Sequence, residues 1–90
     1  MESIKEISKI LKKIDSSKEI QNFLLEILTE SEVETLSKRW CILKMLLAGK
    51  TQRDIAGTLN VGLCNVTRGS KILKNKKSII RKYYNKELKK

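Results

Sequence analysis

The chain has 90 residues, with 33% charged and 40% hydrophobic side chains and a net charge of +10 at pH 7. This length fits one domain with a small core of its own. The sequence has no histidine and only two cysteines, 23 positions apart, which argues against a zinc site and a disulfide scaffold. Neither a signal peptide nor an apolar run of membrane-spanning length is evident, so we expect a cytoplasmic protein.

Four helix starts are expected where a hydroxyl residue is followed three positions later by a carboxylate, because such a pair satisfies backbone N–H groups of the first turn. The pairs are Ser3 with Glu6, Ser16 with Glu19, Thr29 with Glu32, and Thr51 with Asp54. Helical periodicity runs through nearly every segment, and no proline interrupts it. We therefore predict an all-α fold of six helices.

Apolar residues at helical spacing predict a buried face on each of the first three helices. These residues are Ile4, Ile7, Leu11 and Ile14, then Ile20, Phe23, Leu24, Ile27 and Leu28, then Val33, Leu36, Trp40, Leu43 and Leu47. The third helix carries further apolar residues around its circumference, at Cys41, Ile42, Met45 and Leu46. We expect this helix to be central and buried on two sides, and to end at a left-handed Gly49.

Residues 51–70, TQRDIAGTLNVGLCNVTRGS, fit two short helices joined by a turn of three or four residues, which is a helix-turn-helix. Asn60 lies at the turn, where a residue that tolerates left-handed geometry is needed. Ala56 is small where the helices approach, and the apolar residues expected to join them are Ile55, Leu59, Val61 and Val66. The second helix would be the recognition helix, which such motifs place in the major groove of DNA.

A final helix among lysines is predicted from the apolar residues Ile79, Ile80, Tyr83, Tyr84 and Leu88. The expected organisation is a single domain with three parts. Residues 1–49 supply the dimerisation helices, residues 51–73 the helix-turn-helix, and residues 76–89 the C-terminal helix.

The net charge lies in one half of the chain. Residues 1–48 hold eight basic and eight acidic residues, whereas residues 49–90 hold twelve basic and two acidic residues. A basic domain is typical of a polyanion partner, because lysines and arginines that neutralise phosphates release condensed counterions. A solvated surface that only maintains solubility is the alternative. Because the charge coincides with the helix-turn-helix, we predict binding to double-stranded DNA.

A homodimer is the expected assembly, because one chain has too few other helices to cover the central helix. Two subunits would also present two recognition helices to the two halves of a palindrome. The alternative is that the first two helices fold back and bury the central helix within one chain.

Three segments resemble the tryptophan operon repressor family: LTESEVETLSKRWCIL, LLAGKTQRDIAGTLNVG and VTRGSKILK, which lie between residues 28 and 74. The resemblance implies an intertwined helical homodimer that binds operator DNA when L-tryptophan is bound as corepressor. Some positions differ from the family. The link GKTQRD is one residue shorter than in the best-known members, Ile72 replaces a hydroxyl residue near the indole, Asn65 replaces a threonine, and Ala56 replaces a basic residue.

A site for tryptophan needs a cation for the carboxylate, acceptors for the ammonium group and a flat apolar slot. Arg39 and Arg68 can supply charge and planar faces, and the matching arginines of the family flank the indole. Gly69 has no side chain and would leave open the space for this slot. The alternative explanation of Gly69 is a tight helix crossing. The partner's Thr29 and the carbonyls of residues 26–28 match family positions that hold the ligand's backbone groups. The full expected ligand set is Arg39, Arg68, Gly69, Thr29, Leu28, Ile42, Asn65 and Ile72.

A ligand between the central and recognition helices would fix the angle of the recognition helix on DNA, as a population shift. The residues expected at phosphates are Gln52, Arg53 and Lys71, with Lys74 near the backbone. Those expected at base edges are Gly62, Leu63, Cys64, Asn65 and Thr67. Asn65 could read adenine, and Cys64 is alternatively a small packing residue.

We considered three other functions against the sequence. The first is a DNA-binding regulator of the same fold without a tryptophan corepressor. The Arg39–Trp40 pair and the shorter link also resemble a group of repressor-like regulators whose small-molecule partner is not assigned. The second is an RNA-binding protein that stacks bases on Tyr83 and Tyr84. An enzyme is the least favoured, because the sequence has no histidine, no paired buried carboxylates and no phosphate-binding glycine loop.

Overall fold

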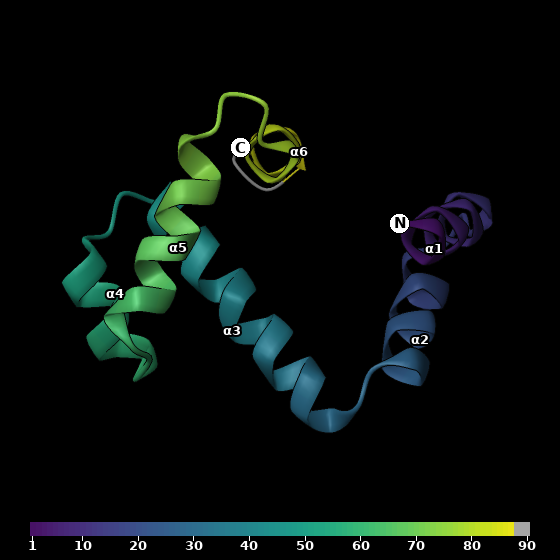
Figure 1. Cartoon of the computed structure of the whole chain (residues 1–90), viewed down its shortest axis with the longest axis horizontal. Helices are drawn as coiled ribbons and strands as arrows, with labels where there is room; N and C mark the ends of the chain where they lie inside the picture. Colours follow the sequence, from purple (N-terminus) through teal and green to yellow (C-terminus); the bar gives the residue numbers. More distant parts are fainter. Residues whose placement is uncertain (88–90) are drawn as a thin grey trace. The chain divides into compact units, whose positions relative to one another are not determined.

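The structure is a computed structural model that describes residues 1–87. Within that range it consists of six helices without strands (Figure 1): α1 (Glu2–Lys13), α2 (Ser17–Ile27), α3 (Glu30–Leu47), α4 (Gln52–Leu59), α5 (Leu63–Lys74) and α6 (Ile79–Glu87). The predicted all-α class and the six helices are confirmed. Leu88 and the expected end of the last helix at residue 89 lie outside the described residues.

Three of the four predicted helix starts are confirmed by hydrogen bonds. Glu32 N–H donates to Thr29 Oγ1 at 3.1 Å, and Thr29 N–H donates to Glu32 Oε1 at 2.9 Å, which is a reciprocal capping box. The hydroxyls of Ser16 and Thr51 accept the N–H of the residue three positions later, at 3.3 and 3.1 Å. These caps fix where α2, α3 and α4 begin.

The predicted start at Ser3 is wrong. Helix α1 begins at Glu2, with Met1 as its N-cap and no side-chain cap. Lys5 N–H donates to the Met1 carbonyl at 3.3 Å, so the first helical turn closes before Ser3 could cap it. Glu2 also places a carboxylate in the first turn, where its negative charge interacts favourably with the positive end of the helix dipole.

The chain forms two compact units, Met1–Glu34 and Thr35–Lys90. In the first unit neither α1 nor α2 contains a buried residue. Ile4, Leu25 and Ile27 are each more than half exposed. The predicted buried faces of these two helices are therefore wrong for a single chain, because two short helices cannot enclose an apolar core by themselves.

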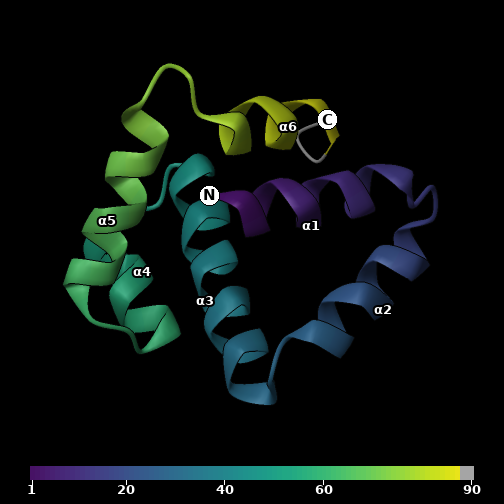
Figure 2. The same cartoon turned by 45° about the vertical axis from the view of Figure 1, so that its right-hand side comes forward.

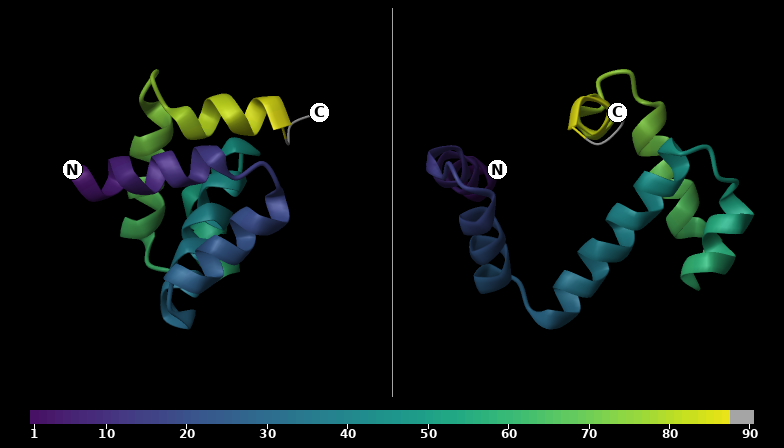
Figure 3. Two further views of the ribbon diagram at one scale, coloured as in Figure 1. Left: turned by 90° about the vertical axis from the view of Figure 1, so that its right-hand side faces the viewer. Right: turned by 180° about the vertical axis from the view of Figure 1, so that it is seen from behind.

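The second unit contains the core of the protein. Ile42, Ile55 and Val66 form a buried cluster, against which Met45, Leu46, Ala56, Leu59 and Val61 pack. Helix α5 lies beside α4 (Figure 2) and crosses α3 (Figure 3). The predicted apolar contacts of the helix-turn-helix are thereby confirmed, and Ile55 and Val66 are fully buried.

Both predicted left-handed positions are confirmed. Asn60 has φ 53° at the turn between α4 and α5. Gly49 has φ 88°, and the N–H groups of Gly49 and Lys50 donate to the carbonyls of Leu46 and Met45. This is the hydrogen-bond pattern of a Schellman motif, which ends α3 and turns the chain towards α4.

Helix α3 is less buried than expected. Only Ile42 and Leu43 are buried in it, whereas Leu36 is 47% and Trp40 37% exposed. The single chain therefore leaves part of α3 exposed, and burial of this helix on two sides stays a prediction for the homodimer. The physical reason is that α5 contacts α3 closely only near Gly69, through Ile42, Leu43 and Leu46. Leu36 and Trp40 line a cavity beside this contact and stay partly exposed.

No helix in the described range is long and apolar enough to cross a membrane. The same residues contain no group of three or more cysteine, aspartate or glutamate side chains that could hold a metal ion. Both cysteines are free thiols, with Cys41 half-buried and Cys64 exposed.

Candidate ligand cavity and nucleic-acid interface

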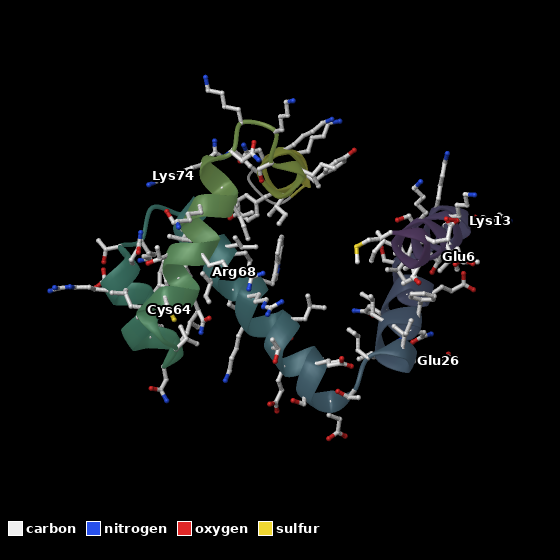
Figure 4. The ribbon with its side chains drawn as sticks, viewed as in Figure 1. Glu6, Lys13, Glu26, Cys64, Arg68 and Lys74 are labelled. Atoms are coloured by element: carbon white, nitrogen blue, oxygen red, sulfur yellow. The ribbon has the colours of Figure 1, made fainter. Side chains whose placement is uncertain are left out.

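The candidate DNA-contacting residues lie on α4 and α5 and at the turn between them. Gly62 is the N-cap of α5 and has no side chain to cap the helix, so the first turn of α5 is open to solvent. The exposed residues of this set are Arg53, Gly62, Leu63, Cys64, Asn65, Thr67, Lys71 and Lys74. Figure 4 shows Cys64 towards the start of α5 and Lys74 at its end. Of these residues, Cys64, Thr67 and Lys71 border one shallow hollow on α5, whereas Gln52 is half-buried.

Gln52 and Thr67 are connected. The Thr67 hydroxyl donates to Gln52 Oε1 at 2.9 Å and lies 3.1 Å from the Leu63 carbonyl. Because a hydroxyl has one proton, its donor is used within the protein and its lone pairs are left as acceptors. The bond also leaves the two amide hydrogens of Gln52 as donors. This arrangement suits Gln52 to a phosphate and Thr67 to a donor group on a base or to water.

A cavity of about 270 Å³ lies between α3, α5 and α6 in the second unit. Five of the predicted ligand residues line it: Arg39, Asn65, Arg68, Gly69 and Ile72. Four residues that we did not predict also line it: Leu36, Trp40, Leu43 and Ile80. Two guanidinium groups and one amide therefore meet an otherwise apolar lining. Such a lining suits a flat apolar ligand that carries a carboxylate.

Gly69 brings α5 close to α3. A Cβ atom at this position would lie 3.1 Å from Ile42 Cγ2 and 3.3 Å from Leu46 Cδ1. The tight helix crossing, which was the alternative explanation of Gly69, is therefore present. Gly69 also lines the cavity, so a small residue here serves both the crossing and the cavity wall.

Trp40 contributes the aromatic part of the cavity wall. Its ring meets the Tyr84 ring edge to face, with centroids 6.5 Å apart and an interplanar angle of 64°. This contact attaches α6 to α3, and Ile80, one helical turn before Tyr84, lines the same cavity. The sequence contains the signals, namely the i, i+4 pairs Leu36–Trp40 and Ile80–Tyr84. From periodicity alone, however, the first pair is assigned to the dimer interface and the second to general helix packing, not to a cavity.

The other three predicted ligand residues do not line this cavity. Ile42 is buried in the core and lies behind Gly69. Leu28 is the C-cap of α2 and Thr29 caps the start of α3, both in the first unit. The carbonyls of residues 26–28 lie in the last turn and at the C-cap of α2, where carbonyls lack partners within the helix. A contribution from these residues to a ligand site stays a prediction.

Comparison with known proteins gives one consistent result. The family model described as Trp repressor protein matches residues 2–88. Three relatives, each named Trp operon repressor homolog, are similar to the chain. The protein of Xylella fastidiosa strain M23 is 40% identical over 82% of this chain and 84% of its own length. That of Vibrio parahaemolyticus is 36% identical over 79% and 70%, and that of Chlamydia trachomatis serovar D is 32% identical over 84% and 82%. No solved structure matches the chain.

Proposed function

The chain belongs to the Trp repressor family, a family of transcription regulators, and from this premise we propose that it is a sequence-specific DNA-binding repressor with L-tryptophan as corepressor. The family resemblance expected from residues 28–74 is confirmed. The observation that supports the corepressor is the cavity beside the recognition helix, where Arg39 of α3 and Arg68 of α5 are both in the lining.

The size and chemistry of the cavity support a ligand of tryptophan's class. Sites for drug-sized ligands occupy roughly 300–1,000 Å³. A cavity of about 270 Å³ lies just below this range and so suits a smaller ligand, such as one amino acid. A guanidinium can stack on an indole while it pairs with a carboxylate. The leucine and isoleucine side chains of the lining would cover the ring edges.

The position of the cavity supports a mechanism for corepression. Asn65, Arg68 and Gly69 lie on the recognition helix α5, and the opposite wall belongs to α3 and α6. A ligand seated between them would favour one placement of α5 over others. Tryptophan then raises DNA affinity if it binds the DNA-competent placement more tightly, and DNA raises tryptophan affinity by the same factor.

We further propose that the protein acts as a homodimer. The first unit has no buried residue in α1 or α2, and Leu36 and Trp40 are partly exposed on α3. A second copy would bury these apolar faces. Two recognition helices would then contact successive major grooves, and the partner's Thr29 and last α2 carbonyls would face the amino acid's backbone groups.

Calorimetric titration tests the corepressor. L-Tryptophan is titrated into the protein, with tyrosine and indole as comparison ligands. We expect one site per subunit, selective for tryptophan, which Arg39→Ala abolishes. Lys38→Ala is the matched control, because it removes the same charge from the neighbouring exposed position, outside this cavity's lining. In Arg68→Ala, DNA binding should lose its dependence on tryptophan. Unchanged tryptophan binding in both arginine variants would contradict the proposed site.

A specific observation favours one alternative, a regulator of this family without a tryptophan corepressor. The indole of Trp40 already forms a wall of the cavity, and Ile72 in the lining replaces a hydroxyl residue. For this alternative, titration gives no heat, equilibrium dialysis shows no bound tryptophan, and DNA affinity is the same in Arg39→Ala and the unaltered protein.

A further inference from the structure

A second group of cations lies outside the helix-turn-helix and outside the cavity. It consists of the exposed residues Lys76, Lys77, Arg81, Lys82 and Lys86, and we call it the basic C-terminal surface. Lys74 ends α5, where the loop to α6 begins (Figure 4). The sequence has no acidic residue between Asp54 and Glu87. This surface therefore carries positive charge without carboxylates of its own segment to balance it.

The two faces of α6 have different chemistry. Ile80 lines the cavity and Tyr84 contacts Trp40, so this side of the helix packs against the rest of the unit. With about 100° of rotation per residue, Lys82 and Lys86 lie on the opposite side. Both lysines are exposed. The packing of α6 thus fixes which side of the helix presents its charge to solvent.

Lys82 and Lys86 form a like-charged pair at i, i+4, which is unfavourable in an isolated helix. Their ammonium groups lie 5.4 and 5.9 Å from the centroid of the Tyr83 ring. The face of a tyrosine ring attracts cations and offsets part of the repulsion. Because a backbone phosphate carries one negative charge, two phosphates beside the two ammonium groups would neutralise both.

We propose that the basic C-terminal surface contacts the phosphate backbone of duplex DNA, independently of base sequence and in addition to the helix-turn-helix. Single-stranded RNA is recognised largely by stacking on free aromatic rings. Here Tyr84 is packed on Trp40, and Tyr83 lies under two ammonium groups. Tyr83 is 50% exposed, but two ammonium groups lie over its ring, so the surface offers mainly charge. The choice of duplex DNA rests on the proposed function, whereas the charge and its exposure do not.

The test is the salt dependence of binding to a random-sequence duplex, measured by fluorescence anisotropy without tryptophan. The variant is Lys82→Gln with Lys86→Gln, because glutamine has a helix propensity close to that of lysine. At about 0.9 per phosphate contact, the slope of log K against log salt should fall by about 1.8. The matched control is Lys5→Gln with Lys9→Gln, also an exposed i, i+4 pair, on α1. Its slope should stay that of the unaltered protein.

A second variant, Lys76→Gln with Lys77→Gln, changes the loop and leaves α6 intact, and should lower the slope similarly. The proposal is wrong if both C-terminal variants keep the original slope, or if the α1 control loses as much as they do. It is also wrong if they lose affinity only for single-stranded RNA, which would assign the surface to RNA. Failure of the unaltered protein to bind any duplex would instead contradict the proposed function.

Discussion

Replacement of Gly69 by alanine tests the close crossing of α5 on α3. Gly69 is buried within α5, and a Cβ atom there would lie 3.1, 3.3 and 3.5 Å from side-chain atoms of Ile42, Leu46 and Leu43. Optimal contacts between carbon atoms are about 3.5–4.0 Å. Two of the three neighbours would thus have to move by a few tenths of an ångström, or α5 would have to move away from α3.

Two opposing effects set the magnitude. Overpacking of a core costs about 1–3 kcal/mol, whereas alanine in place of glycine within a helix gains about 0.8–1.0 kcal/mol. The expected net loss in the free energy of unfolding is therefore about 0–2 kcal/mol. Gly57→Ala in α4 is the matched control, because a Cβ atom added there would have no neighbouring heavy atom within 4 Å. This control should gain the full stabilisation of about 0.8–1.0 kcal/mol from helix propensity. The free energies of unfolding of the two variants should therefore differ by about 1–3 kcal/mol, which is the cost of overpacking.

Urea unfolding followed by circular dichroism measures both variants. The protein concentration must be the same throughout, because the stability of a dimer depends on it. Tryptophan affinity gives a second readout, since Gly69 lines the cavity and a displaced α5 would alter its width. Equal stabilisation of Gly69→Ala and Gly57→Ala would refute the close crossing.

Two further predictions concern the DNA surface and the core. Lys71→Ala should weaken binding to operator and unrelated duplexes alike and lower the salt slope by about 1, as measured by anisotropy over a salt series; a changed base preference would show that Lys71 reads bases instead. Ile55→Ala should cost about 2–5 kcal/mol in urea unfolding, because Ile55 is fully buried between the helices of the motif. A loss as small as that of a surface substitution would show that this core contributes little.

Local sequence signals were sufficient for the helix-turn-helix. Thr51 caps α4 through a residue three positions away, and Asn60 adopts the left-handed conformation that the turn requires. Ile55 and Val66 meet because a short turn brings adjacent helices together. The same reasoning failed at Ser3, where a capping pattern lay one residue inside a helix that had already begun.

The cavity depended on contacts that no local pattern specifies. Arg39 and Arg68 were expected from their chemistry and from the family resemblance, and Gly69 from its missing side chain. The structure brings the three together on one lining. Trp40 and Ile80 were missed as cavity residues, although both lie in apolar stripes that the sequence shows. An i, i+4 stripe indicates that a helix face is apolar, but not whether a helix, a second subunit or a ligand covers it.

The sequence by itself determined the six helices, most of their starts, the helix-turn-helix and the concentration of positive charge in the second half of the chain. These features depend on hydrogen bonds and periodicities within a few residues, or on composition alone. Only the tertiary structure decided that α6 supplies Ile80 to the cavity, and that Gly69 sits against Ile42. Such contacts join residues far apart in the chain, and they depend on how whole helices pack against one another.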